Sequence, residues 1–277
     1  MKRALSIGAA ILVLGLAAGA GPERAAARSL AEAWVNDAAP AAGYDLVLHL
    51  DSLAIYTGGL DLNSGKNAIH GHGAIIDLGQ SAIRALDLRT SLDIDGCVLL
   101  NGPPYPSTGA LVYIQGAEGR VQNCVFYGNN WGLYMKEVVV RATSIVNCIF
   151  MESTVWGAVL HDVYTPPLTY CAAYRNGTGQ PPGSGGDYAL WCGCSTPGPA
   201  PYAPPPESHC LHADPMFVAP STDPALADFH LAPGSPCLGS GDPPGTHLGA
   251  YQEGAAPVEP ATWGRLKSLF HPEAGSR

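Results

Sequence analysis

Short runs of alternating apolar and polar residues, separated by Gly, Asn, Asp and Pro, extend from Tyr44 to about Asn176. Clear examples are residues 45–50 (DLVLHL), 85–88 (ALDL) and 92–95 (LDID). A period of two is typical of strands that bury one face. The pattern therefore predicts many short β-strands.

A second pattern repeats at longer spacing, because a similar group of residues recurs around a cysteine every 23 to 27 residues. An aliphatic residue stands three positions before each cysteine, and a Leu, Phe or Ala stands two positions after it. The four cysteines are Cys97, Cys124, Cys148 and Cys171. Such a period, with strand-like alternation inside it, predicts one coil of a β-solenoid per copy.

The residue before each cysteine indicates how the chain turns. Gly96, Asn123 and Asn147 are of the two types that adopt a left-handed backbone most easily. A corner there would direct the aliphatic residue, the cysteine and the following Leu or Phe inward. Tyr170 replaces Gly or Asn in the last copy, which predicts a distorted coil. We expect an all-β fold, a right-handed parallel β-helix, with the ladder cysteines as buried thiols.

The ends of such a solenoid need covering, since an open end exposes apolar core and unpaired strand edges. Residues 29–34 (SLAEAW) form a capping-box pattern that predicts a short N-terminal helix. Residues 254–277 form a tail with a short amphipathic helix, which is either a C-terminal cap or a sorting or anchoring tag. The Pro-rich run at 196–206 predicts an extended loop that cannot join a sheet.

The first 27 residues are typical of a secretory signal peptide. Lys2 and Arg3 precede an apolar stretch from Leu5 to Leu16, and small residues follow it. The alternative is an uncleaved membrane anchor, although the stretch is short for that. We therefore expect a secreted, periplasmic or cell-surface protein without stable membrane insertion after cleavage, whose β-helix domain spans residues 28–253.

Export also changes the interpretation of the remaining cysteines, because an oxidising compartment permits disulfides. Four cysteines fall outside the ladder, in loop-like sequence, and are the disulfide candidates: Cys192, Cys194, Cys210 and Cys237. The formal net charge of −9 argues against non-specific binding of nucleic acid, which needs a basic surface.

Several segments carry a family resemblance. They are residues 54–59 (AIYTGG), 69–77 (IHGHGAIID), 214–217 (DPMF), 228–237 (DFHLAPGSPC) and 249–252 (GAYQ). With these segments the chain resembles the bacterial secreted right-handed parallel β-helix repeat proteins, whose architecture is shared with pectate lyases and polygalacturonases. The resemblance implies the fold. It leaves the activity open, since this architecture carries lyases, hydrolases, epimerases, adhesins and proteins of no known activity.

A candidate binding face follows from three glycines that each open a strand: Gly109, Gly132 and Gly157. Aligning the strands on these glycines places Val112, Met135 and Leu160 inward. The predicted outward row then consists of Asp87, Arg89, Tyr113, Lys136 and His161. An aromatic ring with scattered polar groups on a shallow groove suits a carbohydrate ligand.

Our leading hypothesis is therefore an exported, monomeric, non-catalytic protein that binds polysaccharide or a cell-surface glycan without a cofactor. The competing hypothesis is a divergent polysaccharide lyase or glycoside hydrolase that acts on uronate-type polymers. A lyase site would use Asp87, Lys136 and His161, with Lys136 as the base, and calcium is expected only in that case. The chain has no Asp-Asp pair of the kind expected for a polygalacturonase-like site. A third hypothesis is a purely structural surface protein.

Overall fold

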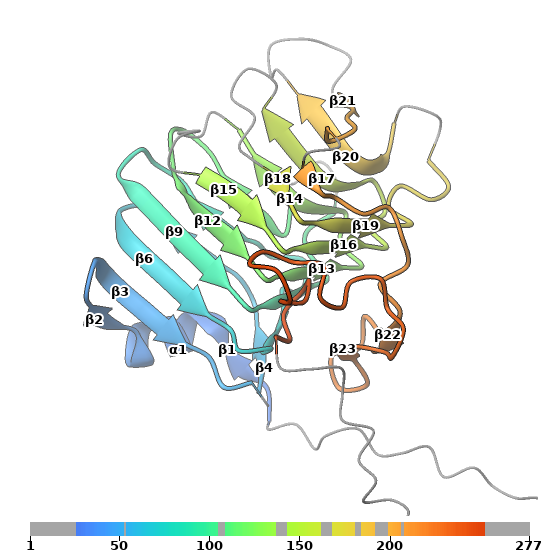
Figure 1. Ribbon diagram of the computed structural model, residues 1–277. Coiled ribbons are helices and arrows are strands. Elements are labelled where there is room, and N and C mark those ends of the chain that lie inside the picture. Colours follow the sequence, from blue (N-terminus) through green and yellow to red (C-terminus); the bar gives the residue numbers. More distant parts are fainter. Residues whose placement is uncertain are drawn as a thin grey trace, which may run out of the picture.

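The computed structural model describes the central part of the chain, and its ranges are residues 26–52, 54–104, 109–136, 143–161, 168–180, 184–191, 199–205 and 208–252. Most of the expected signal peptide lies outside these residues, as do the C-terminal tail, Cys192 and Cys194. The described residues fold as a parallel β-solenoid, which confirms the predicted fold class (Figure 1). In each coil the chain passes through three sheets, here named B, A and C in the order in which it visits them.

Sheet B forms the side that faces the viewer at the left of Figure 1. Its parallel strands are β3 (Tyr44–His49), β6 (Gly65–His70), β9 (Thr90–Asp95), β12 (Gly119–Gln122), β15 (Thr143–Val146) and β18 (Leu168–Thr169). Ile94, Val121 and Ile145 are in register and buried in the interior core, as the repeat predicts.

Sheet A follows sheet B after the cysteine corner. Its parallel strands are β1 (Arg28–Ser29), β4 (Ile55–Thr57), β7 (Ile75–Asp77), β10 (Val98–Leu100), β13 (Val125–Tyr127), β16 (Ile149–Met151) and β19 (Ala172–Tyr174). Leu99, Phe126 and Phe150 point into the interior core as expected, and the two phenylalanine rings stack with centroids 4.9 Å apart. This column of aromatic rings is favourable beyond its burial of apolar area.

Sheet C closes each coil. Its parallel strands are β5 (Leu60–Leu62), β8 (Ile83–Ala85), β11 (Leu111–Tyr113), β14 (Trp131–Met135), β17 (Trp156–His161) and β20 (Gly186–Trp191). Leu111 and Leu133 are in register and fully buried in the same core that sheets A and B share. One continuous apolar column therefore runs through the solenoid, as expected when every coil buries its residues only against its neighbours.

The cysteine corner has the predicted backbone and one more member than predicted. The residue before each cysteine has a positive φ, with 64° at Gly96 and 50° at Asn123. Tyr170 has φ 51°, so its corner has the same backbone as the others and not the distortion that was predicted there. The same geometry occurs at His209, with φ 55°, so Cys210 is a fifth rung of the ladder. Cys210 and Cys237 are free thiols, so these two predicted disulfide candidates form no disulfide in the structure.

The segment after the solenoid folds back along the outer face of sheet A (Figure 1). It contains a small antiparallel pair, β22 (Phe217–Ala219) and β23 (Asp228–Leu231). Phe229 and Leu231 pack against Val125 and Ile149, which point outward from sheet A. The segment thereby buries an apolar face that the sheet would otherwise expose to water.

Parts of both ends of the solenoid are covered. The predicted N-terminal helix is α1 (Leu30–Asp37), where the Ser29 side chain accepts a hydrogen bond from the Glu32 amide. Short antiparallel strands then end two of the sheets: β2 (Ala39–Ala41) beside β3, and β21 (Ala200–Pro201) beside β20. The expectation that the Pro-rich run stays out of the sheets is therefore wrong at β21, because an edge position does not need the missing N–H group.

Candidate functional site

The outer face of sheet C differs from the predicted face by one residue of register in β11. Leu111 pairs with Leu133, and Tyr113 pairs with Met135. Tyr113 is consequently buried in the interior, where its hydroxyl donates a hydrogen bond of 2.8 Å to the Leu92 carbonyl oxygen. The prediction that Tyr113 faces outward is wrong, and so is the inward placement of Val112, which joins an apolar cluster on the outer face.

The error comes from taking Gly109 as equivalent to Gly132 and Gly157. The register of β14 with β17 does align Gly132 with Gly157, but Ala110 and not Gly109 is opposite Gly132. Side chains alternate between the two faces of a strand, so a shift of one residue reverses every side chain in β11. Met135 and Leu160 are inside as predicted, because their alignment was correct.

The other residues of the predicted row lie at or just beyond the ends of β8, β14 and β17. Asp87 and Arg89 lie in the turn between β8 and β9, where they pair with each other at 3.1 Å. That pairing lowers the pKa of the Asp87 carboxyl. Lys136 directly follows β14, and the His161 backbone pairs with Trp191 at the end of β17. The proposed roles of these residues in binding or catalysis stay predictions.

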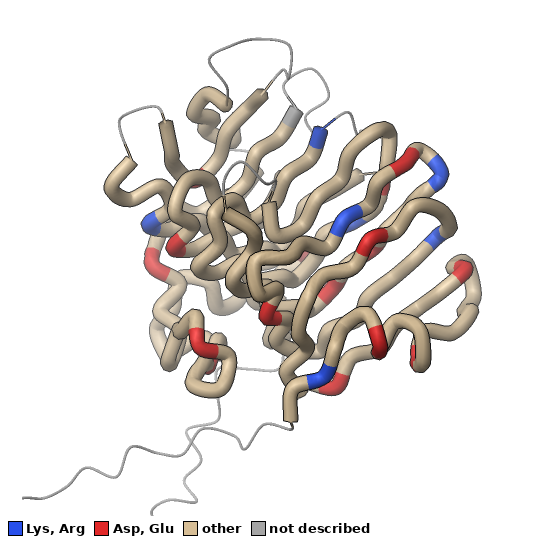
Figure 2. Tube along the Cα trace, turned by 180° about the vertical axis from the view of Figure 1, so that it is seen from behind, with Lys and Arg blue, Asp and Glu red and all other residues tan. Residues whose placement is uncertain are grey.

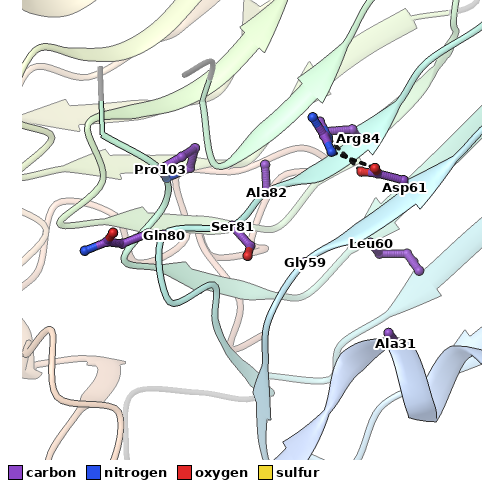
Figure 3. A pocket seen from close by; sticks show the side chains of 9 residues that line it. All are labelled: Ala31, Gly59, Leu60, Asp61, Gln80, Ser81, Ala82, Arg84 and Pro103. Atoms are coloured by element: carbon purple, nitrogen blue, oxygen red, sulfur yellow. Dashed lines mark hydrogen bonds and ion pairs between the residues drawn. The ribbon is translucent and has the colours of Figure 1, made fainter. Parts of the chain in front are cut away.

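The outward row of sheet C instead begins with a charged pair and continues with apolar residues. In register from the N-terminal coil onward, it consists of Asp61, Arg84, Val112, Tyr134, Val159 and Ala189. A pocket of about 510 Å³ lies at the charged end of this row. It is open to solvent, and its walls come from α1, β5, β8 and the segments before β8 and β11 (Figure 3).

The Asp61–Arg84 pair forms the polar wall of this pocket. Arg84 Nε and Nη2 donate to the two Asp61 carboxylate oxygens, each at 2.6 Å. This bidentate pairing raises the pKa of the Arg84 guanidinium. Two of the five guanidinium N–H groups are used in this way, so others remain for a ligand. The side chains are 45% and 44% exposed, so the pair itself contributes little to stability, about 0–1 kcal/mol.

The remaining walls combine small polar and apolar groups. Gln80 and Ser81 are exposed at the rim, and the residues around them are Ala31, Gly59, Leu60, Ala82 and Pro103. Gly59 is required here, because a Cβ at this position would collide with the Ala82 backbone. The close approach of β5 and β8 at this glycine helps to bring Asp61 and Arg84 side by side.

An aromatic cluster borders the pocket, since Ala82 lines the pocket and also packs against this cluster. Trp131 contacts Tyr134 edge-on, with ring centroids 5.4 Å apart, and Trp191 lies 5.8 Å from Tyr134. The indole Nε1 atoms of Trp131 and Trp191 are buried and have no hydrogen-bond partner. A buried indole N–H usually has a partner, so these two donors are unusual features of this face.

Sequence reasoning missed a second polar region, on the outer face of sheet B. Asp93 accepts hydrogen bonds from the Tyr44 hydroxyl at 2.6 Å and from Arg120 Nη2 at 2.9 Å. Three imidazoles also gather near the end of β6, with His49 and His70 ring centroids 5.1 Å apart and His72 within 6.4 Å of both. Only the in-register spacing of β3, β6 and β9 could have revealed these groups.

Within the part of the chain that the structure describes, no group of three or more His, Cys, Asp or Glu residues is arranged to hold a metal ion. No helix in that part is long and apolar enough to cross a bilayer. Charged residues appear as isolated points or mixed pairs along the trace (Figure 2).

No protein-family model matches the chain, and searches of curated proteins and of solved structures also found no match.

Proposed function

We propose that this protein is a non-catalytic glycan-binding β-solenoid and that the pocket beside Asp61 and Arg84 is its binding site. In this proposal it is an exported, right-handed member of the pectate lyase-like superfamily that binds polysaccharide or a cell-surface glycan. The segment likeness described above supports the superfamily, and the N-terminal sequence supports export.

The observation that carries the proposal is the bidentate Asp61–Arg84 pair on the wall of an open pocket. A sugar hydroxyl both donates and accepts hydrogen bonds. A guanidinium with unused N–H groups lies beside a carboxylate with unused lone pairs, so the pocket offers a hydrogen-bond donor and an acceptor to the same sugar hydroxyl. Because the two side chains hold each other, a ligand would find them already oriented, which reduces the entropy lost on binding.

The pocket favours binding over hydrolysis. Glycoside hydrolysis generally uses two carboxyl groups, one as acid and one as base or nucleophile. The residues that line this pocket include one carboxylate, Asp61, which is already engaged by Arg84. We therefore assign the pair to recognition and orientation of the sugar.

A glycan array is the first test, with the wild type and two variants applied to identical arrays. Arg84→Ala removes the guanidinium from the pocket. Arg120→Ala is the matched control, because it removes another exposed arginine that pairs with an aspartate, here Asp93 on sheet B. We expect the wild type and Arg120→Ala to bind the same glycans, and Arg84→Ala to lose about tenfold or more in affinity, since a hydrogen bond from a charged donor contributes about 1.5–3 kcal/mol.

Two results would contradict the proposal. One is an array on which the wild type binds no glycan. The other is an equal loss of affinity in both arginine variants, which would show that binding does not depend on the pocket. Incubation with uronate polymers, monitored by the absorbance of unsaturated products, tests the lyase alternative. Turnover with or without calcium would favour the catalytic function over the proposed binding function.

A further inference from the structure

The pocket beside Asp61 and Arg84 has walls without net charge. Of the described residues that line it, only these two are charged, and the others are small, apolar or neutral polar. The pair lies at the edge of sheet C, because β5 is the end strand of that sheet. Val112, which is buried and apolar, follows Arg84 in the outward row. The row therefore adds no second cation beside the pair.

The charges that α1 brings to this side of the molecule are also unsuited to an anionic ligand. Ala31 of α1 lines the pocket, and the next residue, Glu32, is an exposed carboxylate. Arg28, which precedes the helix, is paired with Asp37 at 2.5 Å. The formal net charge of the whole chain is −9. An excess of one sign of charge repels ligands of the same sign, so a polyanion is disfavoured here.

Asp61 also occupies the part of Arg84 that is best suited to a carboxylate. Arg84 Nε and Nη2 form a planar fork, and both donate to the Asp61 oxygens at 2.6 Å. Such bidentate pairs are among the strongest hydrogen-bonded pairs in proteins. A ligand carboxylate at the remaining N–H groups would lie next to Asp61, and like charges within about 4–6 Å disfavour each other's charged form. A sugar hydroxyl at the same place meets no such repulsion.

The other side of the pocket offers neutral groups. Figure 3 shows Gln80 and Pro103 on that side, with Ser81 and Ala82 between them and the charged pair. The Gln80 amide and the Ser81 hydroxyl can each donate and accept hydrogen bonds without carrying a charge. Apolar walls with a few polar groups are typical of small-molecule sites, where the polar groups fix the orientation of the ligand. These groups match the hydroxyls and the C–H faces of an uncharged sugar.

We propose that the pocket selects uncharged sugars and that Asp61 is its specificity-determining residue, which rejects uronates and other anionic glycans. This inference rests on the proposed function, because it names the class of glycan that the same pocket accepts. Asp61 occupies the fork of Arg84 and places a negative charge where a ligand carboxylate would have to lie. An amide in place of this carboxylate removes the charge, so the pocket of Asp61→Asn should accept a uronate.

A second glycan array, printed with matched pairs of oligosaccharides, tests the proposal. Each pair is a neutral galactan, glucan or mannan and its form oxidised at the primary hydroxyl, which is a galacturonan, glucuronan or mannuronan of the same linkage. We expect the wild type to bind at least one neutral member about tenfold or more tightly than its oxidised form, because of the like-charge repulsion. In Asp61→Asn this ratio of affinities should fall to about threefold or less.

Glu152→Gln is the matched control, because it also replaces a carboxylate by an amide in a surface pair, here with Arg175 at 3.0 Å on another coil. We expect this variant to keep the wild-type ratio. The ratio is the readout, since a substitution that only disturbs the fold lowers both affinities and leaves their ratio unchanged.

Two outcomes would overturn the proposal and leave glycan binding intact. In one, the wild type binds an oxidised member as tightly as its neutral counterpart. In the other, Asp61→Asn keeps the wild-type ratio, so that the selection does not depend on Asp61. A wild type that binds no member of any pair would contradict the proposed function itself, and the inferred selectivity with it.

Discussion

Two buried tyrosines illustrate how single hydroxyl groups affect this core. Tyr113 and Tyr188 both lie inside the solenoid and are at most 1% exposed. The Tyr113 hydroxyl has a carbonyl partner at 2.8 Å, whereas the Tyr188 hydroxyl has none. Burial raises the pKa of both groups well above its ordinary value. A Tyr→Phe substitution at each site therefore compares the loss of a hydrogen-bonded hydroxyl with the loss of a hydroxyl that has no partner.

We expect Tyr113→Phe to lower the free energy of unfolding by about 1–3 kcal/mol, because it leaves the Leu92 carbonyl without this donor. Tyr188→Phe should be neutral or stabilising, because it removes a buried group that has no partner. Urea denaturation monitored by circular dichroism measures both changes. An equal loss of stability in the two variants would contradict this account of the core.

Residue types alone predicted the corner before each of the four ladder cysteines, but not the equivalent corner before Cys210. Gly96, Asn123 and Asn147 marked the left-handed corner correctly, because few other residues adopt that backbone cheaply. Cys210 was missed because it follows Cys171 by 39 positions, an interval that includes the Pro-rich run at 196–206. A fixed period finds coils of similar length and overlooks a coil that carries an insertion.

At the scale of elements, the thiol column makes stability depend on pH. The pKa values of Cys124, Cys148 and Cys171 are raised mainly by burial, and that of Cys97 mainly by its contact with Cys124. A raised pKa in the folded state gives stability that is complete below the unfolded pKa and is lost as the pH rises above it. The unfolded thiols ionise near pH 8.5, so the loss begins there.

We therefore expect the free energy of unfolding to fall above pH 8.5, with each of the four buried thiols adding about 1.4 kcal/mol per pH unit once it is ionised in the unfolded chain. Cys210 acts in the opposite sense, because its lowered pKa stabilises the fold above pH 8.5 and this contribution is lost as the pH falls through about 7. Urea unfolding at pH 8, 9 and 10 measures the slope. A slope that does not become shallower in Cys124→Ala would contradict the assignment.

The strands of sheets A and B could be aligned from sequence, whereas one strand of sheet C could not. Three markers per repeat, the aliphatic residue, the cysteine and the following Leu or Phe, fix the corner between sheets B and A. Sheet C had only a glycine as its marker, and Gly109 was off by one residue. Glycine has no side chain to indicate a face. The pocket beside Arg84 could not be located before the register of β5 and β8 was known, because that register places Asp61 beside Arg84.

At the scale of the whole molecule, one edge of sheet B and one edge of sheet C oppose self-association. A parallel solenoid with open edges can add a second copy as a further strand. Here β2 and β21 end their sheets in antiparallel orientation, and each carries a proline, Pro40 or Pro201, that lacks an N–H group. A further strand would find no complete row of donors at these edges.

We expect the protein to be monomeric in solution, with the mass of one chain by light scattering after size-exclusion chromatography. The double variant Pro40→Val and Pro201→Val restores the two edge donors and should show a concentration-dependent increase in mass. A wild-type dimer at micromolar concentration would contradict the role of these edges.

The three faces of the solenoid have different surroundings. The C-terminal segment packs on the outer face of sheet A, sheet B carries the Asp93–Arg120 pair and the imidazoles, and sheet C carries the pocket with its aromatic border. The glycan proposal places its ligand on sheet C.

The position of a bound glycan tests the central claim most directly. A crystal structure of the protein with the best ligand from the array should show a sugar ring in the pocket formed by α1, β5 and β8, with hydroxyl groups within hydrogen-bond distance of Arg84 and Asp61. A glycan on the outer face of sheet B, beside Arg120 and the imidazoles, would contradict it.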